Sequence, residues 1–352
     1  MRRRDIHAAL RRRVRGPYAA LGRLDARLHD VQQRLARTEA MLAAAVEELA
    51  ALRAAGEEGR EVARHSLAVA QESLGETRAA GGLLTASHEL LSDEFRPLLR
   101  AIVSEESANR RRLHELRADP EYGAPWEEEW PLVSVTVATR DRAALLAERC
   151  LPSLLGQSYP ALEVIVVGDH ADEDTAEAVG AVGDERVIYR NLTQRLDFTD
   201  DRHRHWLVAS TMARNEAMRL ARGRWVMCFD DDDAMRPDCV ERLLARAREE
   251  RLEAVYGQAM LHRDSEPEFA IGTFPPRLGG FTWASGMYHG GLRFFERETY
   301  AADLGLPGDW FLASRMLRAG VRFGMIEDCL SDVYPSPMNL ARPDEAGHPD
   351  PS

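Results

Sequence analysis

An apolar run of strand length at residues 224–229 ends in consecutive carboxylates. They are Asp230, Asp231, Asp232 and Asp233. Like charges at this spacing repel and raise one another's pKa, so the cluster requires a neutralising partner. A hard divalent cation such as Mg2+ or Mn2+ would serve, because it takes oxygen ligands and keeps part of its shell for water and phosphates. A structural explanation stays open, since acidic residues before Pro237 can also be solvated or stabilise a helix N-terminus.

Polar residues also follow two earlier apolar runs. Thr139 follows the run at 132–138, and Asp169 follows the run at 162–167. Each could be an ordinary turn residue. Ligands of α/β proteins bind beyond the carboxyl ends of parallel strands, however, so we expect Thr139, Asp169 and the aspartates to lie on one edge of a sheet. Their convergence there would indicate a binding site.

The elements that position these residues belong to the α/β class. Short β-branched runs occur at 132–138, 162–167, 186–189, 224–229 and 254–258. Helical periods lie between them at 143–155, 172–179, 209–221 and 237–250. This alternation predicts a Rossmann-like, mostly parallel sheet with helices on both faces.

Composition limits the class of protein. The chain has 352 residues, 45% of them hydrophobic, and a net charge of -12, which allows a sizeable core and disfavours a nucleic-acid partner. The four cysteines show no CxxC spacing, so zinc and a disulfide framework are not expected. The chain shows neither an apolar run of membrane-spanning length nor a signal peptide, and we therefore predict a cytoplasmic location.

The region before the sheet is predicted to be helical. Residues 1–17 form an Arg-rich arm, and the stretch Arg2 to Arg15 could either lie on anionic lipid or be solvated. Leucines recur every seven residues from Leu21 to Leu49 within a helical region at 18–118, which favours a coiled coil that makes a homo-oligomer. The alternative is a helix that folds back on the second helical stretch of the same chain.

Composition also places the remaining boundaries. Residues 119–130 are rich in Pro, Gly and acid and are predicted to be a linker. The α/β domain then spans 131–335. The Pro-rich acidic tail at 336–352 is predicted to be disordered.

Residues 131–335 resemble family 2 glycosyltransferases with the GT-A fold. The matching segments are L-V-S-V-T-V-A-T-R-D-R at 132–142, C-L-P-S-L-L-G-Q-S-Y-P at 150–160, E-V-I-V-V-G-D at 163–169, A-R-N-E-A at 213–217 and G-D-W at 308–310. They are similar to the family's opening strand and P-T-Y-N-R turn, its first helix, its second strand, its A-R-N helix and the segment that supplies the catalytic base. Their order and spacing together carry the resemblance.

The resemblance implies a nucleotide-sugar donor bound at the edge of the sheet. Asp169 would contact the nucleobase and Asp230 the nucleoside, with Thr139 beside them. Asp232 would bind Mn2+ or Mg2+, with Asp230, Asp231 and Asp233 available to share donor or metal binding. Arg214 is a candidate for the diphosphate, unless it is only a surface ion pair.

The implied reaction is an inverting, hexosyl-transferring glycosylation of an unidentified acceptor hydroxyl. Such a transfer needs the charge of the leaving diphosphate neutralised, which a metal can do, and a base for the acceptor. Asp309 would be that base, unless it only caps the helix that follows it. Two other functions stay open: a non-catalytic scaffold assembled through the coiled coil, and a sugar nucleotidyltransferase. The latter class usually has a Gly-rich phosphate loop after its first strand, and residues 138–143 contain no glycine.

Overall fold

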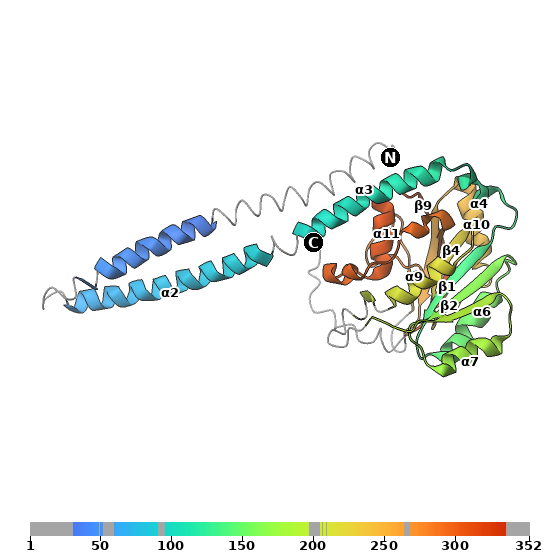
Figure 1. Cartoon of the computed structure of the whole chain (residues 1–352), viewed down its shortest axis with the longest axis horizontal. Helices are drawn as coiled ribbons and strands as arrows, with labels where there is room; N and C mark the ends of the chain where they lie inside the picture. The colour runs from blue at the N-terminus through green and yellow to red at the C-terminus, as the bar shows by residue number, and fades with distance from the viewer. Residues whose placement is uncertain are drawn as a thin grey trace. The chain divides into compact units, whose positions relative to one another are not determined.

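The computed structural model describes residues 31–48, 50–51, 60–90, 96–196, 205, 207–208, 210–263 and 268–335. The chain divides into two compact units, Met1–Glu105 and Glu106–Ser352 (Figure 1). The Arg-rich arm at 1–17 and the tail at 336–352 lie outside the described residues. No helix in the described ranges is both long enough and apolar enough to cross a bilayer.

The first unit contains a helical hairpin. Residues 31–48 are helical and pack against α2 (Arg60–Leu90). The Gln32 amide donates to the carbonyl oxygen of Leu84 (3.4 Å), and Arg78 pairs with Glu39 (2.8 Å), so the two helices run antiparallel. The predicted heptad helix therefore packs within one chain, as the alternative interpretation had it. Its first positions, including Leu21, lie outside the described residues.

The second unit is built on a mixed sheet of strand order β3-β2-β1-β4-β8-β6-β9-β5, with β7 paired to β6. The strands are β1 (Val133–Thr139), β2 (Leu162–Gly168), β3 (Val187–Asn191), β4 (Trp225–Asp230), β5 (Ala234–Met235), β6 (Ala254–Leu261), β7 (Phe269–Ile271), β8 (Gly286–His289) and β9 (Phe323–Val333). The block from β3 to β4 is parallel, β8 runs antiparallel to β4 and β6, and β9 is parallel to β6. The predicted sheet is confirmed.

Helices cover both faces of the sheet (Figure 1). The helices and helical turns are α3 (Arg96–Ala118), η2 (Pro120–Gly123), α4 (Ala124–Glu127), α5 (Ala143–Leu145), η3 (Leu146–Cys150), α6 (Leu151–Leu155), α7 (Glu173–Val182), α9 (Thr211–Leu220), α10 (Cys239–Glu250), η4 (Gly290–Phe294), η5 (Thr299–Leu304) and α11 (Gly308–Ala319). On one face α6 and α10 pack on Val135 and Met227. On the other, α9 and α11 pack on Val226 and Cys228. Alternate side chains of the same strands thus enter two separate apolar cores.

The segment predicted as a linker is instead folded against the sheet. Trp126 of α4 is 5% exposed and packs edge-to-face on Trp225 (5.6 Å between ring centroids). Just before it, Arg117 of α3 binds both oxygens of the fully buried Glu253 at 2.7 Å, and the Tyr122 hydroxyl donates to the same carboxylate. The Pro- and Gly-rich composition predicted a loop, but burial of these aromatic rings makes residues 119–130 part of the sheet unit.

Candidate functional site

The register of the parallel strands brings the predicted site residues to one edge. Ala138 of β1 lies opposite Asp230 of β4, and Thr139 lies opposite Gly168 of β2. The backbone N–H of Asp169 donates to the carbonyl oxygen of Thr139 (2.8 Å). The carboxyl ends of three neighbouring strands therefore meet, as the sequence pattern predicted.

Asp169 is buried at this edge and only partly satisfied. It is 5% exposed, and its Oδ1 has no hydrogen-bond partner among the described residues. Burial raises the pKa of Asp169, against the opposing positive charges of Arg140, His170 and Arg214. A buried oxygen without a donor is costly, so this atom is suited to accept a hydrogen bond from a ligand.

Two non-glycine residues with left-handed backbone flank the edge. Asp141, in the turn after β1, has a φ of 51°, and His170, in the turn after β2, has a φ of 56°. Such conformations are uncommon outside glycine and persist where the surrounding structure holds them. The Asp141 carboxylate accepts the backbone N–H of Asp172 (3.1 Å), which ties the two turns together.

Asp230 forms an ion pair with Arg214 of α9. The Asp230 side chain is 42% exposed and that of Arg214 is 19% exposed, so the pair faces solvent on its carboxylate side. The Ser210 hydroxyl accepts a hydrogen bond from Arg214 Nε (2.8 Å) and fixes the guanidinium. Burial would lower the pKa of Arg214, but the charges of Asp230 and Asp309 raise it overall, which keeps the guanidinium charged.

The carboxylates of Asp231 and Asp232 both bind the guanidinium of Arg142. Arg142 Nη1 lies 3.0 Å from Asp231 Oδ1 and 2.7 Å from Asp232 Oδ2. Their side chains are 8% and 12% exposed. Burial raises the pKa of Asp231, against the positive charge of Arg142. Arg142 was not predicted from the sequence, although it ends the turn that resembles P-T-Y-N-R.

Asp233 points elsewhere. It is 2% exposed, and its Oδ1 accepts the backbone N–H of Tyr334 (3.0 Å). Burial, together with the charges of Asp230 and Asp232, raises the pKa of Asp233 well above its usual range. Within the described part of the chain no group of three or more His, Cys, Asp or Glu side chains is arranged to hold a metal ion.

The carboxylate oxygens of Asp231 and Asp232 nevertheless fit a hard cation that takes its further ligands from the substrate. Mg2+ is commonly held by one or two carboxylates together with substrate phosphates and water. Asp231 and Asp232 supply two carboxylate oxygens directed at one point, where Arg142 now provides the positive charge.

Asp309 lies at the start of α11, and its carboxylate is held at both oxygens. Arg297 Nη1 contacts Oδ1 at 2.7 Å, and the backbone N–H of Trp283 donates to Oδ2 at 3.3 Å. No side-chain cap hydrogen bond forms at this helix N-terminus, where Pro307 is the N-cap, so capping does not explain Asp309. Its side chain is 32% exposed. Burial would raise the pKa of Asp309, but the charges of Arg297 and Arg214 and the hydrogen bonds at both oxygens lower it.

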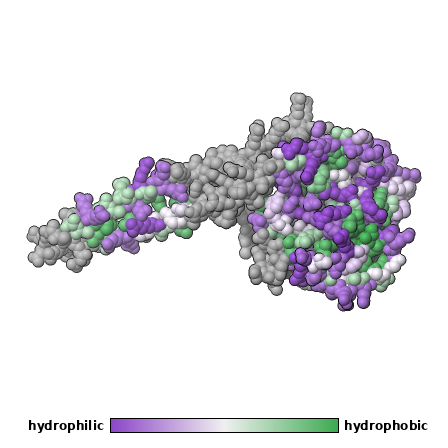
Figure 2. All heavy atoms as spheres, viewed as in Figure 1, coloured by the Kyte–Doolittle hydropathy of each residue, from purple (hydrophilic) through white to green (hydrophobic). Residues whose placement is uncertain are grey.

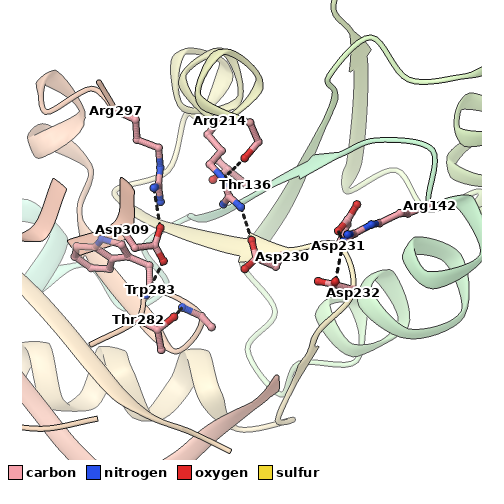
Figure 3. Close-up of polar contacts among 12 residues, drawn as sticks. Thr136, Arg142, Arg214, Asp230, Asp231, Asp232, Thr282, Trp283, Arg297 and Asp309 are labelled. Carbon is pink, nitrogen blue, oxygen red and sulfur yellow. Dashed lines mark hydrogen bonds and ion pairs between the residues drawn. The ribbon is translucent and has the colours of Figure 1, made fainter. Parts of the chain in front are cut away.

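These contacts form three polar groups along the same edge (Figure 3). Arg297 and Asp309 stand at one end, Arg214 and Asp230 in the middle, and Arg142 with Asp231 and Asp232 at the other. Electrostatic interactions of Arg214 with Asp309, and of Arg142 with Asp230, connect neighbouring groups. The predicted residues of the edge and Asp309 are thus brought together, whereas Asp233 faces away toward the end of β9.

Fold and site together define the class: an α/β domain with an acidic cluster at the carboxyl ends of its strands, the edge at which such domains bind their ligands. Comparison with known proteins gives a family match for part of the chain. Residues 134–303 match the family model for Glycosyl transferase family 2. The resemblance drawn from the motifs and the predicted GT-A type of fold are thereby confirmed.

Curated relatives include the succinoglycan biosynthesis protein ExoO of Rhizobium meliloti, 35% identical over 117 residues that make up 33% of this chain and 30% of the relative. A GalNAc(5)-diNAcBac-PP-undecaprenol beta-1,3-glucosyltransferase of Campylobacter jejuni is 27% identical over 139 residues, or 38% of this chain and 40% of the relative. The chain spans less than half the length of each.

Solved structures with similarity include S. aureus TarS in complex with UDP, at a TM-score of 0.46 and 17% identity, covering 59% of this chain and 62% of that chain. The mannosyltransferase PcManGT of Pyrobaculum calidifontis, solved with GDP-Man and Mn2+, has a TM-score of 0.45 at 19% identity and covers 67% and 66%.

Proposed function

We propose that this protein transfers a hexosyl group, with inversion, from a nucleotide-diphosphate sugar to an acceptor hydroxyl. The observation that carries the proposal is the row of polar groups at one sheet edge, which combines a donor-type acidic site with a partly exposed carboxylate, Asp309. A donor and an acceptor bound along this row would place the reacting atoms between Asp230 and Asp309. The acceptor and the sugar are left open.

On the donor side, each residue has one task. Asp169 accepts a hydrogen bond from the nucleobase, since its buried Oδ1 has no partner among the described residues. Thr139 lies beside it, and Asp230, 42% exposed, accepts from the nucleoside. Arg214 offers its guanidinium to the diphosphate, a group that arginine binds well because of its planar fork of donors.

Asp232 and Asp231 would hold Mn2+ or Mg2+ against the diphosphate. When bound, the ion neutralises negative charge as it develops on the leaving group. Arg142 pairs with these two carboxylates in the structure and keeps both oxygens directed at one point, which the ion would occupy in its place. Asp230 is available as a further ligand, whereas Asp233 is engaged with the backbone of Tyr334.

Asp309 takes the proton from the acceptor hydroxyl as that oxygen attacks the sugar. The two bonds that hold its carboxylate use one lone pair on each oxygen, and an ionised carboxylate has about four such sites. An acceptor can therefore hydrogen-bond to the exposed part of the group. Its lowered pKa keeps Asp309 ionised and ready to act as base at neutral pH.

The helical hairpin is proposed as the element of self-association. Its exposed apolar side chains include Val31, Met41, Val69 and Leu83, with exposed fractions of 41%, 74%, 50% and 72%, and Figure 2 shows hydrophobic residues along it. A second copy that covers them would make a homo-oligomer. A cytoplasmic location completes the proposal, and the stretch Arg2–Arg15 stays open between lipid contact and a solvated arm.

The test is calorimetric titration with a panel of nucleoside diphosphates, in Mn2+ and in chelator. We expect one nucleotide to bind in a metal-dependent way to the wild type and to the control Asp174→Ala, an exposed aspartate of α7, but not to Asp232→Ala. Absence of binding by any nucleotide would favour the non-catalytic scaffold. Synthesis of a nucleotide sugar from a sugar phosphate and a nucleoside triphosphate would favour the nucleotidyltransferase.

A further inference from the structure

Arg297 does not belong to any motif of the sequence, yet it is the charged partner of Asp309. Its side chain is 6% exposed, and Nη1 lies 2.7 Å from Asp309 Oδ1. A guanidinium is expensive to bury unless it is paired, so this contact has a reason beyond chance proximity. The segment that carries Arg297, between η4 and η5, has no predicted function.

The backbone of Arg297 is clamped from α9. Asn215 accepts the N–H of Arg297 through Oδ1 (2.9 Å) and donates from Nδ2 to the carbonyl oxygen of the same residue (2.9 Å). A single side-chain amide thus satisfies both backbone polar groups of one residue, on either side of its Cα, which fixes the position of the Arg297 Cα. Asn215 directly follows Arg214, the partner of Asp230.

The surroundings of Asp309 are dominated by two cations. Arg297 contacts it from the segment before η5, Arg214 acts on it from α9, and the Trp283 N–H approaches from the loop before β8. Asp230 lies on the far side of Arg214 and partly neutralises it. With Arg297 removed, one carboxylate oxygen of Asp309 would lose its anchor, and a single cation would act on the group.

We propose that Arg297, held in place by Asn215, is the positioning residue of Asp309 and fixes the orientation in which this carboxylate meets the acceptor. The inference rests on the proposed function. Through Arg214 and Asn215, two consecutive residues of α9, the same helix holds the donor-side carboxylate Asp230 and the anchor of the base. Donor site and base are thus kept in register by one rigid element.

The test compares Arg297→Gln and Arg297→Lys with the wild type and with Arg293→Gln. Arg293 is a matched control because it is a part-buried arginine of the neighbouring turn η4 that binds the carbonyl oxygens of Gly290 and Ala221 rather than a carboxylate. The readout is release of nucleoside diphosphate from sugar conjugates of the nucleotide identified by calorimetry, followed as kcat/KM against pH. Nucleotide affinity and thermal unfolding are measured in parallel.

We expect Arg297→Gln to lower kcat at least tenfold and to move the acidic limb of the profile upward by about one pH unit, because an adjacent arginine lowers a carboxyl pKa by about that much or more. Arg297→Lys keeps a positive charge but not the planar guanidinium, so it should restore most of the pH profile and still lower kcat more than Arg293→Gln does; that loss of rate is the readout if the glutamine variant does not fold. Nucleotide affinity should change less than about threefold in both.

An unshifted profile in both variants, with a loss of rate no larger than that of Arg293→Gln, would overturn the inference and leave the proposed function intact. Absence of donor turnover by the wild type at every pH would overturn the proposed function and the inference with it. The two failures are therefore distinguishable.

Discussion

Replacing Asp309 by asparagine removes the proposed base and preserves the shape of the side chain. The asparagine oxygen can still accept from Arg297, so the fold should be retained. General-base catalysis contributes roughly 100- to 10,000-fold to a rate, and each tenfold equals about 1.4 kcal/mol. We therefore expect kcat to fall by two to four orders of magnitude, roughly 3–5 kcal/mol in the barrier, with nucleotide affinity unchanged.

The same substitution has a predictable effect on stability. Arg297, 6% exposed, loses its charged partner, which would cost several kcal/mol in a dry site. Because the Asp309 side chain is 32% exposed, solvent screens the pair and about 1–3 kcal/mol is expected. Asp309 has a pKa below its ordinary value of 3.8, so the stabilising contribution is present above that pH and is lost as pH falls through the folded-state pKa.

The assay is steady-state release of nucleoside diphosphate, with thermal unfolding measured from pH 3 to pH 8. Asp174→Asn, on the exposed surface of α7, is the control for a lost surface charge. A rate within threefold of the wild type would refute the assignment of Asp309 as base. Equal destabilisation at pH 3 and pH 7 would refute the reasoning about the ion pair.

Two further predictions concern the elements that support the site. Glu253→Gln should destabilise the sheet unit by about 2–3 kcal/mol at pH 7, because the buried carboxylate accepts hydrogen bonds from Arg117 and Tyr122. Since the pKa of Glu253 lies below 4.5, the difference in unfolding free energy from the wild type should shrink as pH falls below that value. A difference in denaturant unfolding that stays constant with pH would contradict this. A fragment that begins at Glu106 should fold and be monomeric. One that begins at Pro131 lacks Trp126 and should unfold at a lower denaturant concentration. An oligomeric mass of the Glu106 fragment by light scattering would exclude the hairpin as the element of assembly.

The sequence predicted the sheet and its acidic edge because both leave local signals. β-branched runs mark strands, and carboxylates that directly follow them, such as Asp169 and Asp230, must lie where the strands end. No such signal marks Arg142 or Arg297. An isolated arginine in a turn or loop belongs to no periodic pattern. The partner Asp232 lies about 90 residues from Arg142 in the sequence, and Asp309 lies 12 residues from Arg297, so only the fold brings each pair together.

One prediction failed. The Pro- and Gly-rich composition of 119–130 indicated a linker, but tertiary packing of Trp126 overrides local turn preference. The heptad pattern favoured pairing between chains; its described residues pack against α2 of the same chain, whose Leu67 and Leu74 are buried, and pairing between chains stays a proposal. A pattern of apolar residues specifies that a face is covered and does not specify by what.

The sheet changes direction between β4 and β8, and this divides the molecule into halves that can diverge separately. Strands of the parallel block end in the residues proposed for the donor, whereas Asp309 and its anchors come from the loop before β8, the segment before η5 and α11. Under the proposed function, insertions or exchanges in the later half would change which acceptor is bound and leave donor recognition in place. Exchange of the later half with that of a related protein would then succeed where α9 is kept whole. Arg214 of this helix binds Asp230 in one half, and Asn215 binds the backbone of Arg297 in the other.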